Sequence, residues 1–283
     1  MKKIPGSFKD KSNQVYEDSD KIIRVINPKI NTVFPEIFKS NLINNLIENN
    51  YIIDSEIDKS YSNNDKNLIF IKHKRINFIS YPYEWSNIFL YHAGLKTLEL
   101  NKYLLEYDYH LVDANAFNLQ YIGGKPLLID IGSIVNYDHK YGWLGMNEFI
   151  CSFFNPLYFT SMSSIRFNDV YKSFLNGIPS SFIYKVKRLK DFFRLRFILN
   201  IFIHERMMMK IYKMNKLKNK NRQKERSISK KKYKSIIELQ ENFLRKTYLS
   251  INHNSSYWDS YTSCMHNYSN NDIEKKESII TNY

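Results

Sequence analysis

The chain has 283 residues, a formal net charge of +14 and two cysteines. This length suits one large domain or two small lobes. The two cysteines lack metal-ligand spacing, which argues against a disulfide scaffold or a zinc site. The sequence has no run of about 18 apolar residues, and its N-terminus lacks the apolar core of a secretory signal. We therefore expect a cytoplasmic protein without a transmembrane segment.

The first part of the chain predicts a small, strand-rich lobe. Strands bounded by turn residues are expected over 8–16, as a hairpin, and over 21–26, 67–73 and 76–80. Between them, apolar residues at helical spacing predict an amphipathic helix over 35–50. We assign residues 1–80 to this lobe, in which strands, a helix and further strands follow in order.

The rest of the chain predicts helices. A long helix is expected over 84–107, because leucines recur along one of its faces, and it ends shortly before Asp113. Shorter helices are expected over 147–154 and within 170–214. We assign 81–205 to a helical lobe and 206–283 to a basic helical or mobile segment with a C-terminal tail.

Most of the positive charge lies in one segment. From Lys210 to Lys234 there are twelve Lys or Arg residues against one Glu. The segment has few apolar anchors and almost no aromatic residues for stacking, so sequence-specific nucleic-acid recognition is poorly supported. Two interpretations remain open: a solvated or mobile segment, and a contact with a polyanion or an anionic membrane.

The candidate site residues lie between Leu111 and Ser133. Asp113 stands five residues before Asn118, and a short strand, a Gly-Gly turn and a second strand lead to Asp130. Such a hairpin brings Asp130 back to the end of the ladder where Asn118 lies. Magnesium accepts amide and carboxylate oxygen ligands, which leaves Asp113 to accept a hydroxyl proton. The alternative is that these three residues cap loops and form an Asx turn.

This spacing resembles that of protein kinases. There, an Asp of the catalytic loop accepts the substrate proton, and an Asn five residues later and the Asp of an Asp-Phe-Gly triplet hold magnesium. Here the triplet is Asp130-Ile131-Gly132. The resemblance implies an α+β, protein-kinase-like two-lobe fold with a small strand-rich N-lobe and a helical C-lobe. It also implies ATP and Mg as cofactors, Asp113 as the catalytic residue, and Asn118 and Asp130 as metal ligands.

The phosphate-binding part of the kinase pattern is less complete. Kinases place a Lys within Val-Ala-Ile-Lys on the third strand, paired with a helix carboxylate, and no such motif is present. Arg24 is the best positional substitute, and Glu36 or Glu48 on the following helix could pair with it. A glycine-rich loop is also missing, because only Gly6 precedes the first hairpin. The alternative for Arg24 is a strand residue whose stem packs while its head reaches solvent.

Several blocks of the chain resemble those of one bacterial family: Gly6-Ser7-Phe8-Lys9-Asp10, Tyr81-Pro82-Tyr83-Glu84-Trp85, 113–118, 149–157 and parts of the tail over 258–276. These are SAM-dependent methyltransferases of the nodulation-related type, which carry a kinase-like region ahead of the methyltransferase domain. In that family the tail leads into the glycine-rich turn that binds S-adenosylmethionine. None of the eight glycines here forms a G-x-G cluster. We therefore expect this chain to resemble the front part of the family, without the methyltransferase domain.

Two classes of function follow from these patterns. The first is an atypical kinase, a Mg-ATP-dependent phosphotransferase that acts on a saccharide or small-molecule hydroxyl. The alternative is a non-catalytic kinase-like module, or a truncated front part of a methyltransferase. Such a module would serve a partner methyltransferase or a polysaccharide-modifying system. The retained Asp113, Asn118 and Asp130 favour catalysis, and the missing glycine loop and third-strand Lys favour the module.

Overall fold

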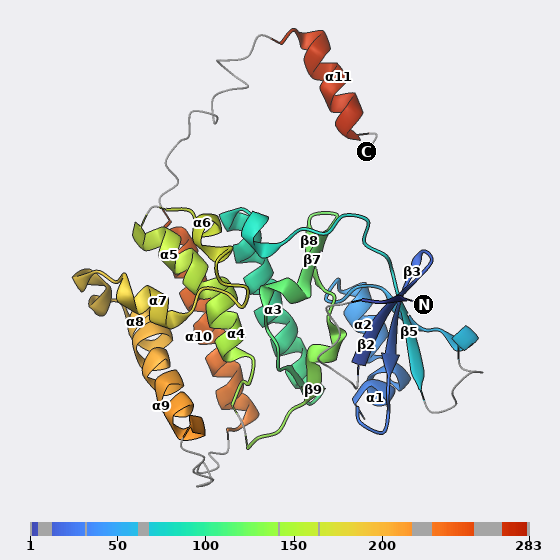
Figure 1. Ribbon diagram of the computed structural model, residues 1–283, viewed down its shortest axis with the longest axis horizontal. Helices are drawn as coiled ribbons and strands as arrows, with labels where there is room; N and C mark the ends of the chain where they lie inside the picture. The colour runs from blue at the N-terminus through green and yellow to red at the C-terminus, as the bar shows by residue number, and fades with distance from the viewer. Residues whose placement is uncertain are drawn as a thin grey trace. The chain divides into compact units, whose positions relative to one another are not determined.

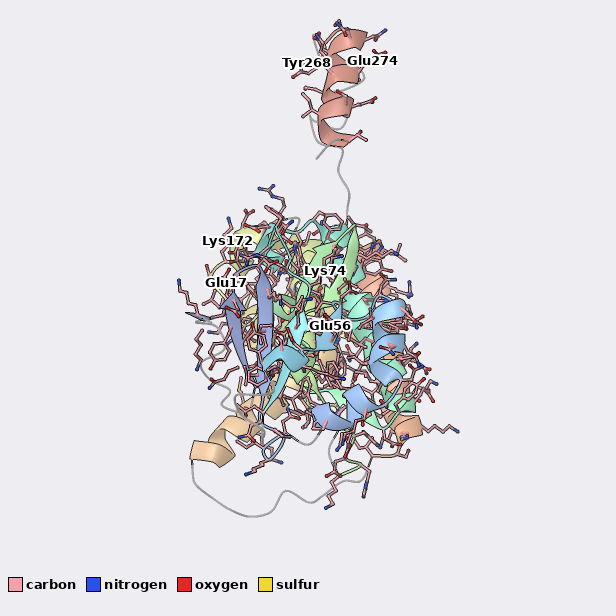
Figure 2. The ribbon with its side chains drawn as sticks, turned by 90° about the vertical axis from the view of Figure 1, so that its right-hand side faces the viewer. Glu17, Glu56, Lys74, Lys172, Tyr268 and Glu274 are labelled. Carbon is pink, nitrogen blue, oxygen red and sulfur yellow. The ribbon has the colours of Figure 1, made fainter. Side chains whose placement is uncertain are left out.

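A computed structural model describes residues 2–4, 13–31, 33–61, 68–140, 142–163, 165–216, 228–251 and 268–281. The chain divides into one compact unit over Met1–Ile251 and a second unit over Asn252–Tyr283. The described part of the second unit is the helix α11 (Asn270–Thr281), which has no buried residue. Figure 2 marks Tyr268 and Glu274 of this unit, in which the Lys276 ammonium lies 3.5 Å from the centre of the Tyr268 ring.

The first unit begins with a five-stranded antiparallel sheet (Figure 1). Its order is β1-β2-β3-β5-β4, with bounds β1 Lys2–Lys3, β2 Asn13–Asp18, β3 Lys21–Ile26, β4 Ser55–Ile57 and β5 Ile69–His73. Two short helices, α1 (Val33–Lys39) and α2 (Leu42–Glu48), stand between β3 and β4 in the chain. A 3-10 turn, Lys59–Tyr61, follows β4. The predicted hairpin over 8–16 lies partly outside the described residues, and β2 pairs with β1 instead.

The last strand of this sheet differs from the prediction. Residues 69–73 form β5, but 76–80 form no strand, and the fifth strand is the earlier segment β4. The reason is that β5 has both of its edges occupied, by β3 on one side and β4 on the other. The segment 76–80 therefore has no edge of β5 to pair with, and it leads onward to the helical part.

The predicted helix over 35–50 is also divided. It forms as α1 and α2, separated at Ser40 and Asn41. The Ser40 hydroxyl donates to the Ile37 carbonyl and accepts from the Leu42 backbone amide, at 2.9 and 3.3 Å. A serine that bonds to nearby backbone in this way competes with the helical pattern and ends one helix where the next begins. The apolar stripe itself was predicted correctly, since Ile37, Leu42 and Leu46 are buried.

The helical part is built on α3 (Asn87–Glu106), which confirms the long predicted helix. Two small antiparallel pairs follow it: β6 (Tyr109–Leu111) with β9 (Ile134–Asn136), and β7 (Leu119–Ile122) with β8 (Lys125–Leu128). Both glycines of the β7–β8 turn have positive φ, 56° at Gly123 and 76° at Gly124, as a type I′ turn requires. The predicted hairpin is therefore confirmed.

The remaining helices form the larger part of the unit. One helical stretch runs over α4 (Met146–Phe149), a π-helical turn (Ile150–Phe154) and α5 (Asn155–Ser163). Then come α6 (Phe167–Tyr171), α7 (Ser180–Lys185), the turn η7 (Leu189–Phe193), α8 (Leu195–Phe197), a second π-helical turn (Ile198–Ile203), α9 (His204–Lys216) and α10 (Lys230–Leu249). Short 3-10 turns cover Pro82–Glu84, Ala116–Asn118 and Ile131–Ser133.

Helix α10 belongs to the first unit although its sequence is strongly basic. A Cβ atom built on Gly94 of α3 would lie 2.8 Å from the Leu244 side chain, so α10 packs closely on α3 at this glycine. Tyr233, Ile237 and Leu244 of α10 are fully buried. Of the basic segment from Lys210 to Lys234, the part over 217–227 lies outside the described residues, while Tyr233 at its end anchors α10 in the core.

The buried apolar side chains of the first unit form two clusters. The larger cluster gathers residues of α3, the 146–163 helical stretch and α10. The smaller cluster joins residues of β3, β5, α1 and α2 to residues of α3, β6, β8 and β9. The chain after α2 joins the two parts, because the Ile53 amide donates to Leu128 and the Leu128 amide donates to Tyr51, at 3.0 and 2.9 Å. The expected α+β class is therefore confirmed, and the arrangement is compatible with a two-lobe fold.

Among the described helices, none combines the length and the apolar character that a membrane crossing needs.

Candidate functional site

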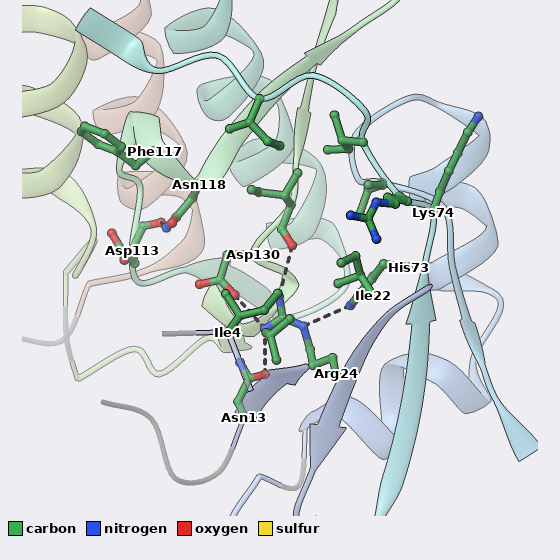
Figure 3. Close-up of a pocket in the computed structure, with 16 residues that line it drawn as sticks. Ile4, Asn13, Ile22, Arg24, His73, Lys74, Asp113, Phe117, Asn118 and Asp130 are labelled. Carbon is green, nitrogen blue, oxygen red and sulfur yellow. Dashed lines mark hydrogen bonds and ion pairs between the residues drawn. The ribbon is translucent and has the colours of Figure 1, made fainter. Parts of the chain in front are cut away.

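A cavity of about 820 Å³ lies where the sheet meets the 113–130 segment (Figure 3). Aliphatic side chains form much of its wall: Ile4, Val15, Ile22, Ile53, Ile76, Ile79 and Ile129. The cavity also contains all four residues that the sequence singled out, namely Arg24, Asp113, Asn118 and Asp130. Strand β3 supplies Arg24, and the loops around the β7–β8 hairpin supply the other three. The fold thus brings together groups that are separated by up to 106 positions in the chain.

Arg24 is the most highly connected of these residues. Its side chain donates to Asn13 Oδ1 at 2.7 Å, Asp130 Oδ1 at 2.9 Å, His73 Nε2 at 3.1 Å and the Ile129 carbonyl at 3.2 Å. Arg24 is only 5% exposed, so its head does not reach solvent as one alternative had supposed. Its carboxylate partner is Asp130, whereas Glu36 and Glu48 of the helices are both exposed. The pairing expected with a helix glutamate is replaced by a pairing with a predicted metal ligand.

His73 extends this network to the edge of the sheet. An arginine N–H can only donate, so the lone pair on His73 Nε2 accepts from Arg24 and the ring proton sits on Nδ1. Nδ1 then donates to the Ser55 hydroxyl at 2.8 Å, which donates to the Ile53 carbonyl at 2.7 Å. Burial, and then the charge of Arg24, lowers the pKa of His73 to about 3. The histidine is therefore neutral at physiological pH and serves as a fixed acceptor for Arg24.

Asp130 is held at the start of a short turn. Its Oδ1 accepts from Arg24 and from the Gly132 backbone amide at 3.2 Å, as an Asx turn does. The hairpin delivers it beside Asn118, because the Ile129 amide donates to the Asn118 carbonyl at 2.8 Å. Asp130 remains 37% exposed, and both recorded bonds fall on one oxygen. Within the described residues, its second oxygen is thus available to a ligand.

The glycine of the Asp130-Ile131-Gly132 triplet is required by close approach. A Cβ atom at Gly132 would lie 1.8 Å from Asn13 Nδ2 and 3.0 Å from Asp130 Oδ1. Asn13 cannot move aside without cost, because it is 6% exposed and accepts from Arg24. The glycine therefore lets the Asp130–Gly132 turn pack against β2.

We expect Gly132→Ala to lower the free energy of unfolding by about 1–3 kcal/mol, as overpacking of a tight site does. Denaturant unfolding of the purified protein measures this. Gly142→Ala is the matched control, because its Cβ would meet only the mobile end of the Ile228 side chain, at 3.2 Å. Equal stability of the two variants would contradict the close approach at Gly132.

Asp113 and Asn118 form the other wall of the cavity (Figure 3). The Asn118 amide nitrogen donates to the Asp113 carbonyl at 3.2 Å, so its amide oxygen is left for a ligand. Asp113 Oδ1 is buried and has no hydrogen-bond partner within the described residues. Burial first, and then the charge of Asp130, raise the pKa of Asp113, although hydrogen bonds from Asn118 and Asn115 oppose the rise. A buried acceptor without a donor suits a group that receives a proton from a bound molecule.

The strand that precedes Asp113, β6, is held by contacts with α10. His110 lies in β6, beyond the C-cap of α3 at Tyr107. Its Nδ1 lies 2.9 Å from the Tyr233 hydroxyl, which also accepts from Asn101 at 3.3 Å. Asn101 in turn accepts from the Leu111 amide at 2.9 Å. Burial lowers the pKa of His110 to about 4, so this link is uncharged at neutral pH.

The aromatic block Tyr81–Trp85 lies outside the cavity lining. Tyr81 and Tyr83 stack with ring centres 5.4 Å apart, and Trp85 is buried against Tyr121. The backbone of Ser80 exchanges two hydrogen bonds with the Gln120 amide. The block therefore packs at the boundary between the two parts of the first unit. The cavity is lined instead by residues that precede this block in the chain, namely Lys74, Arg75, Ile76 and Ile79.

Sequence reasoning missed Asn13, Ser55 and His73, which hold Arg24 in place. Nothing in the local pattern marks Asn13, because it is one of several polar residues around the start of a strand. His73 could have been suspected, since it is a histidine at the end of a mainly apolar strand, IFIKH. Ser55 belongs to a strand that the sequence did not reveal, so its place in the network depends on the fold alone.

The donor set fits a magnesium ion better than a transition metal. Within the described residues, no group of three or more His, Cys, Asp or Glu side chains converges on one point, as a zinc site would require. An amide oxygen and a carboxylate oxygen are the hard ligands that magnesium takes, with phosphates and water completing the shell. Asn118 and Asp130 would hold the ion.

The comparisons with known proteins point to one relative. The chain is similar to the nodulation protein NoeA of Rhizobium meliloti (strain 1021), with 29% identity over 204 residues. The alignment covers 71% of this chain and 42% of that protein, so the chain spans less than half the length of the curated relative. No family model matches the chain. The two proteins are thus related in sequence, in keeping with the nodulation-related resemblance of the sequence blocks.

Proposed function

We propose that the cavity binds Mg-ATP and that the protein transfers a phosphoryl group to the hydroxyl of a saccharide or another small molecule. One observation carries this proposal: Arg24, Asp113, Asn118 and Asp130 line the same cavity of about 820 Å³. That volume lies within the range of small-molecule and cofactor sites. The aliphatic side chains suit a nucleotide base, and the amide and carboxylate oxygens suit a magnesium-bound phosphate chain.

The proposed reaction assigns a role to each polar residue. The acceptor oxygen forms a bond to the γ-phosphorus, the bond from that phosphorus to the bridging oxygen breaks, and ADP leaves. The proton of the acceptor hydroxyl passes to Asp113, whose buried Oδ1 has the free capacity to take it. Asn118 and Asp130 would hold the magnesium ion, which would supply positive charge to the phosphate oxygens.

Arg24 has a smaller part in this scheme than the third-strand Lys of a kinase. A guanidinium has five N–H donors, and four hydrogen bonds from Arg24 to protein atoms are recorded. One N–H on Nη2 is left for a phosphate oxygen. The main contribution of Arg24 is therefore to hold Asp130 at the cavity, and a phosphate contact would be secondary.

Nucleotide binding is expected to raise the thermal stability of the protein in the presence of Mg-ATP. A ligand at a hundredfold excess over its Kd stabilises the folded state by about 2.7 kcal/mol. The shift should require magnesium and should vanish in Asp130→Asn, because that variant lacks the metal carboxylate. Asp169→Asn, an exposed carboxylate outside the cavity lining, is the control and should keep the shift. An unchanged shift in Asp130→Asn would remove the metal site from the proposal.

A second candidate is a non-catalytic module that serves a partner methyltransferase or a polysaccharide-modifying system. The ion pair between Arg24 and Asp130 favours it, because the guanidinium already supplies the positive charge that a metal would bring. In this case the hydrogen bonds of Arg24 to Asn13, His73 and Asp130 are a structural joint between the sheet and the hairpin. The same thermal measurement separates the two candidates: stability that does not change at millimolar Mg-ATP supports the module.

A further inference from the structure

The turn η7 and its flanks hold large apolar side chains in solvent. Phe193 is 91% exposed and Leu189 is 87% exposed, the two highest values among the large hydrophobic side chains that the structure describes. Leu195, just beyond the turn, is 59% exposed. The segment lies between α7 and α8 (Figure 1). We call residues 185–196 the basic turn.

Hydrogen bonds hold the backbone of this segment in place. They are centred on Asp191, whose side chain is fully buried. Its carboxylate accepts from the Arg188 backbone amide at 2.8 Å and from the Tyr158 hydroxyl at 3.0 Å, and the Arg188 and Arg194 side chains lie within 3.5 Å. Arg188 also donates to the Met162 carbonyl. A buried carboxylate thus fixes the backbone in a form that points Leu189 and Phe193 outward.

The basic turn carries mostly positive charge. Between Lys185 and Arg196 there are six Lys or Arg residues, and the single acidic residue is Asp191, which is buried. Outside the turn, Glu205 of α9 interacts with Lys185. Lys185 and Lys190 are exposed on the basic turn itself. A surface of this kind is complementary to a negatively charged partner. Burial of the exposed Leu189 and Phe193 side chains in an apolar environment would be favourable.

A further apolar side chain lies close to the basic turn. Leu249, at the end of α10, is 80% exposed. The next residue, Ser250, accepts a hydrogen bond of 3.1 Å from Arg196. This bond brings the end of α10 to the end of the basic turn, so that the apolar and basic groups of the two segments lie near one another.

We infer that the basic turn is a docking surface for an anionic membrane. Leu189 and Phe193 insert between lipid chains while the lysines meet the headgroups, which is how peripheral proteins combine apolar burial with charge attraction. An acidic protein surface would match the charge but would leave two protruding apolar tips without a matching pocket. This docking is independent of the nucleotide cavity and would place the catalytic or module function at a lipid surface.

Vesicle sedimentation of the whole chain tests this. The protein should bind vesicles of phosphatidylcholine mixed with phosphatidylserine and should bind pure phosphatidylcholine weakly. The double variant Leu189→Ser/Phe193→Ser should partition into the mixed vesicles at least about tenfold less, because it loses the burial of two large side chains. It keeps every charge, including those from Lys210 to Lys234, so general attraction to anionic lipid is unchanged in it.

Matched variants make the outcome decisive. Ile30→Ser/Phe78→Ser removes two exposed apolar side chains from the strand-rich part and should bind like the original protein. Lys185→Gln/Lys190→Gln should weaken binding most at low salt, where charge attraction is least screened. Equal binding by the Leu189/Phe193 variant and the original protein would overturn the proposal. Absence of binding to any vesicle would also overturn it.

Discussion

Asp113→Asn is expected to lower phosphoryl transfer by about 10²–10⁴-fold, the usual contribution of a general base. The side chain keeps its shape but can no longer take the proton of the acceptor hydroxyl. Transfer of labelled phosphate from ATP to a panel of saccharides and small alcohols measures the effect. The thermal shift with Mg-ATP should persist in this variant, because Asn118 and Asp130 are untouched. A variant that retained full transfer would exclude Asp113 as the base.

The same substitution should make the protein more stable at neutral pH. The pKa of Asp113 is raised in the folded state, mainly by burial, so the folded protein binds this proton more tightly than the unfolded chain. Stability therefore falls as pH rises from the unfolded pKa through the raised folded pKa. Asparagine removes this loss. The Tm of Asp113→Asn should exceed that of the original protein at pH 7, and the difference should disappear in acid, where Asp113 is protonated.

Asp138→Asn is the control for this stability effect, because Asp138 is an exposed carboxylate just beyond β9. It should leave the Tm almost unchanged. A higher Tm of Asp113→Asn that persisted at low pH would show that the buried charge is not its cause. A site residue whose removal stabilises the fold is held there at the expense of stability, as functional groups often are.

Arg24→Met is expected to lower the free energy of unfolding by about 3 kcal/mol, because it leaves buried polar partners without a donor. Methionine preserves much of the packed stem, so the loss reports on the guanidinium. Asn13 and His73 are buried and lose their recorded bonds to Arg24, while Asp130, 37% exposed, recovers part of its loss through water. Denaturant unfolding measures the change.

Arg75→Met is the matched control. Arg75 also forms an ion pair, with Glu17 at 2.7 Å, but both side chains are about two-fifths exposed. Exposed pairs contribute about 0–1 kcal/mol, so this variant should lose little. Arg24→Lys should fall between the two, since an ammonium keeps the charge but cannot reach four acceptors in the geometry of a guanidinium. Equal losses in Arg24→Met and Arg75→Met would contradict the joint that Arg24 forms between sheet and hairpin.

The sequence by itself determined the features that depend on neighbouring residues. The leucine stripe predicted α3, and the Gly-Gly pair predicted the β7–β8 turn. The spacing of Asp113, Asn118 and Asp130 placed these residues near one end of that hairpin, because a tight turn sets its own register. These predictions needed only local hydrogen bonding and the helical period, which act over a few residues.

The tertiary structure decided which distant groups meet. Strand β4, rather than the segment 76–80, pairs with the edge of β5. Arg24 pairs with Asp130, 106 positions away, rather than with a glutamate of the nearby helices. The burial of Asp113 and His73, and hence the direction of their pKa shifts, followed from the same packing. Such contacts depend on how the sheet with α1 and α2 packs against α3 and the hairpin, and the pattern of residue types along the sequence does not specify that packing.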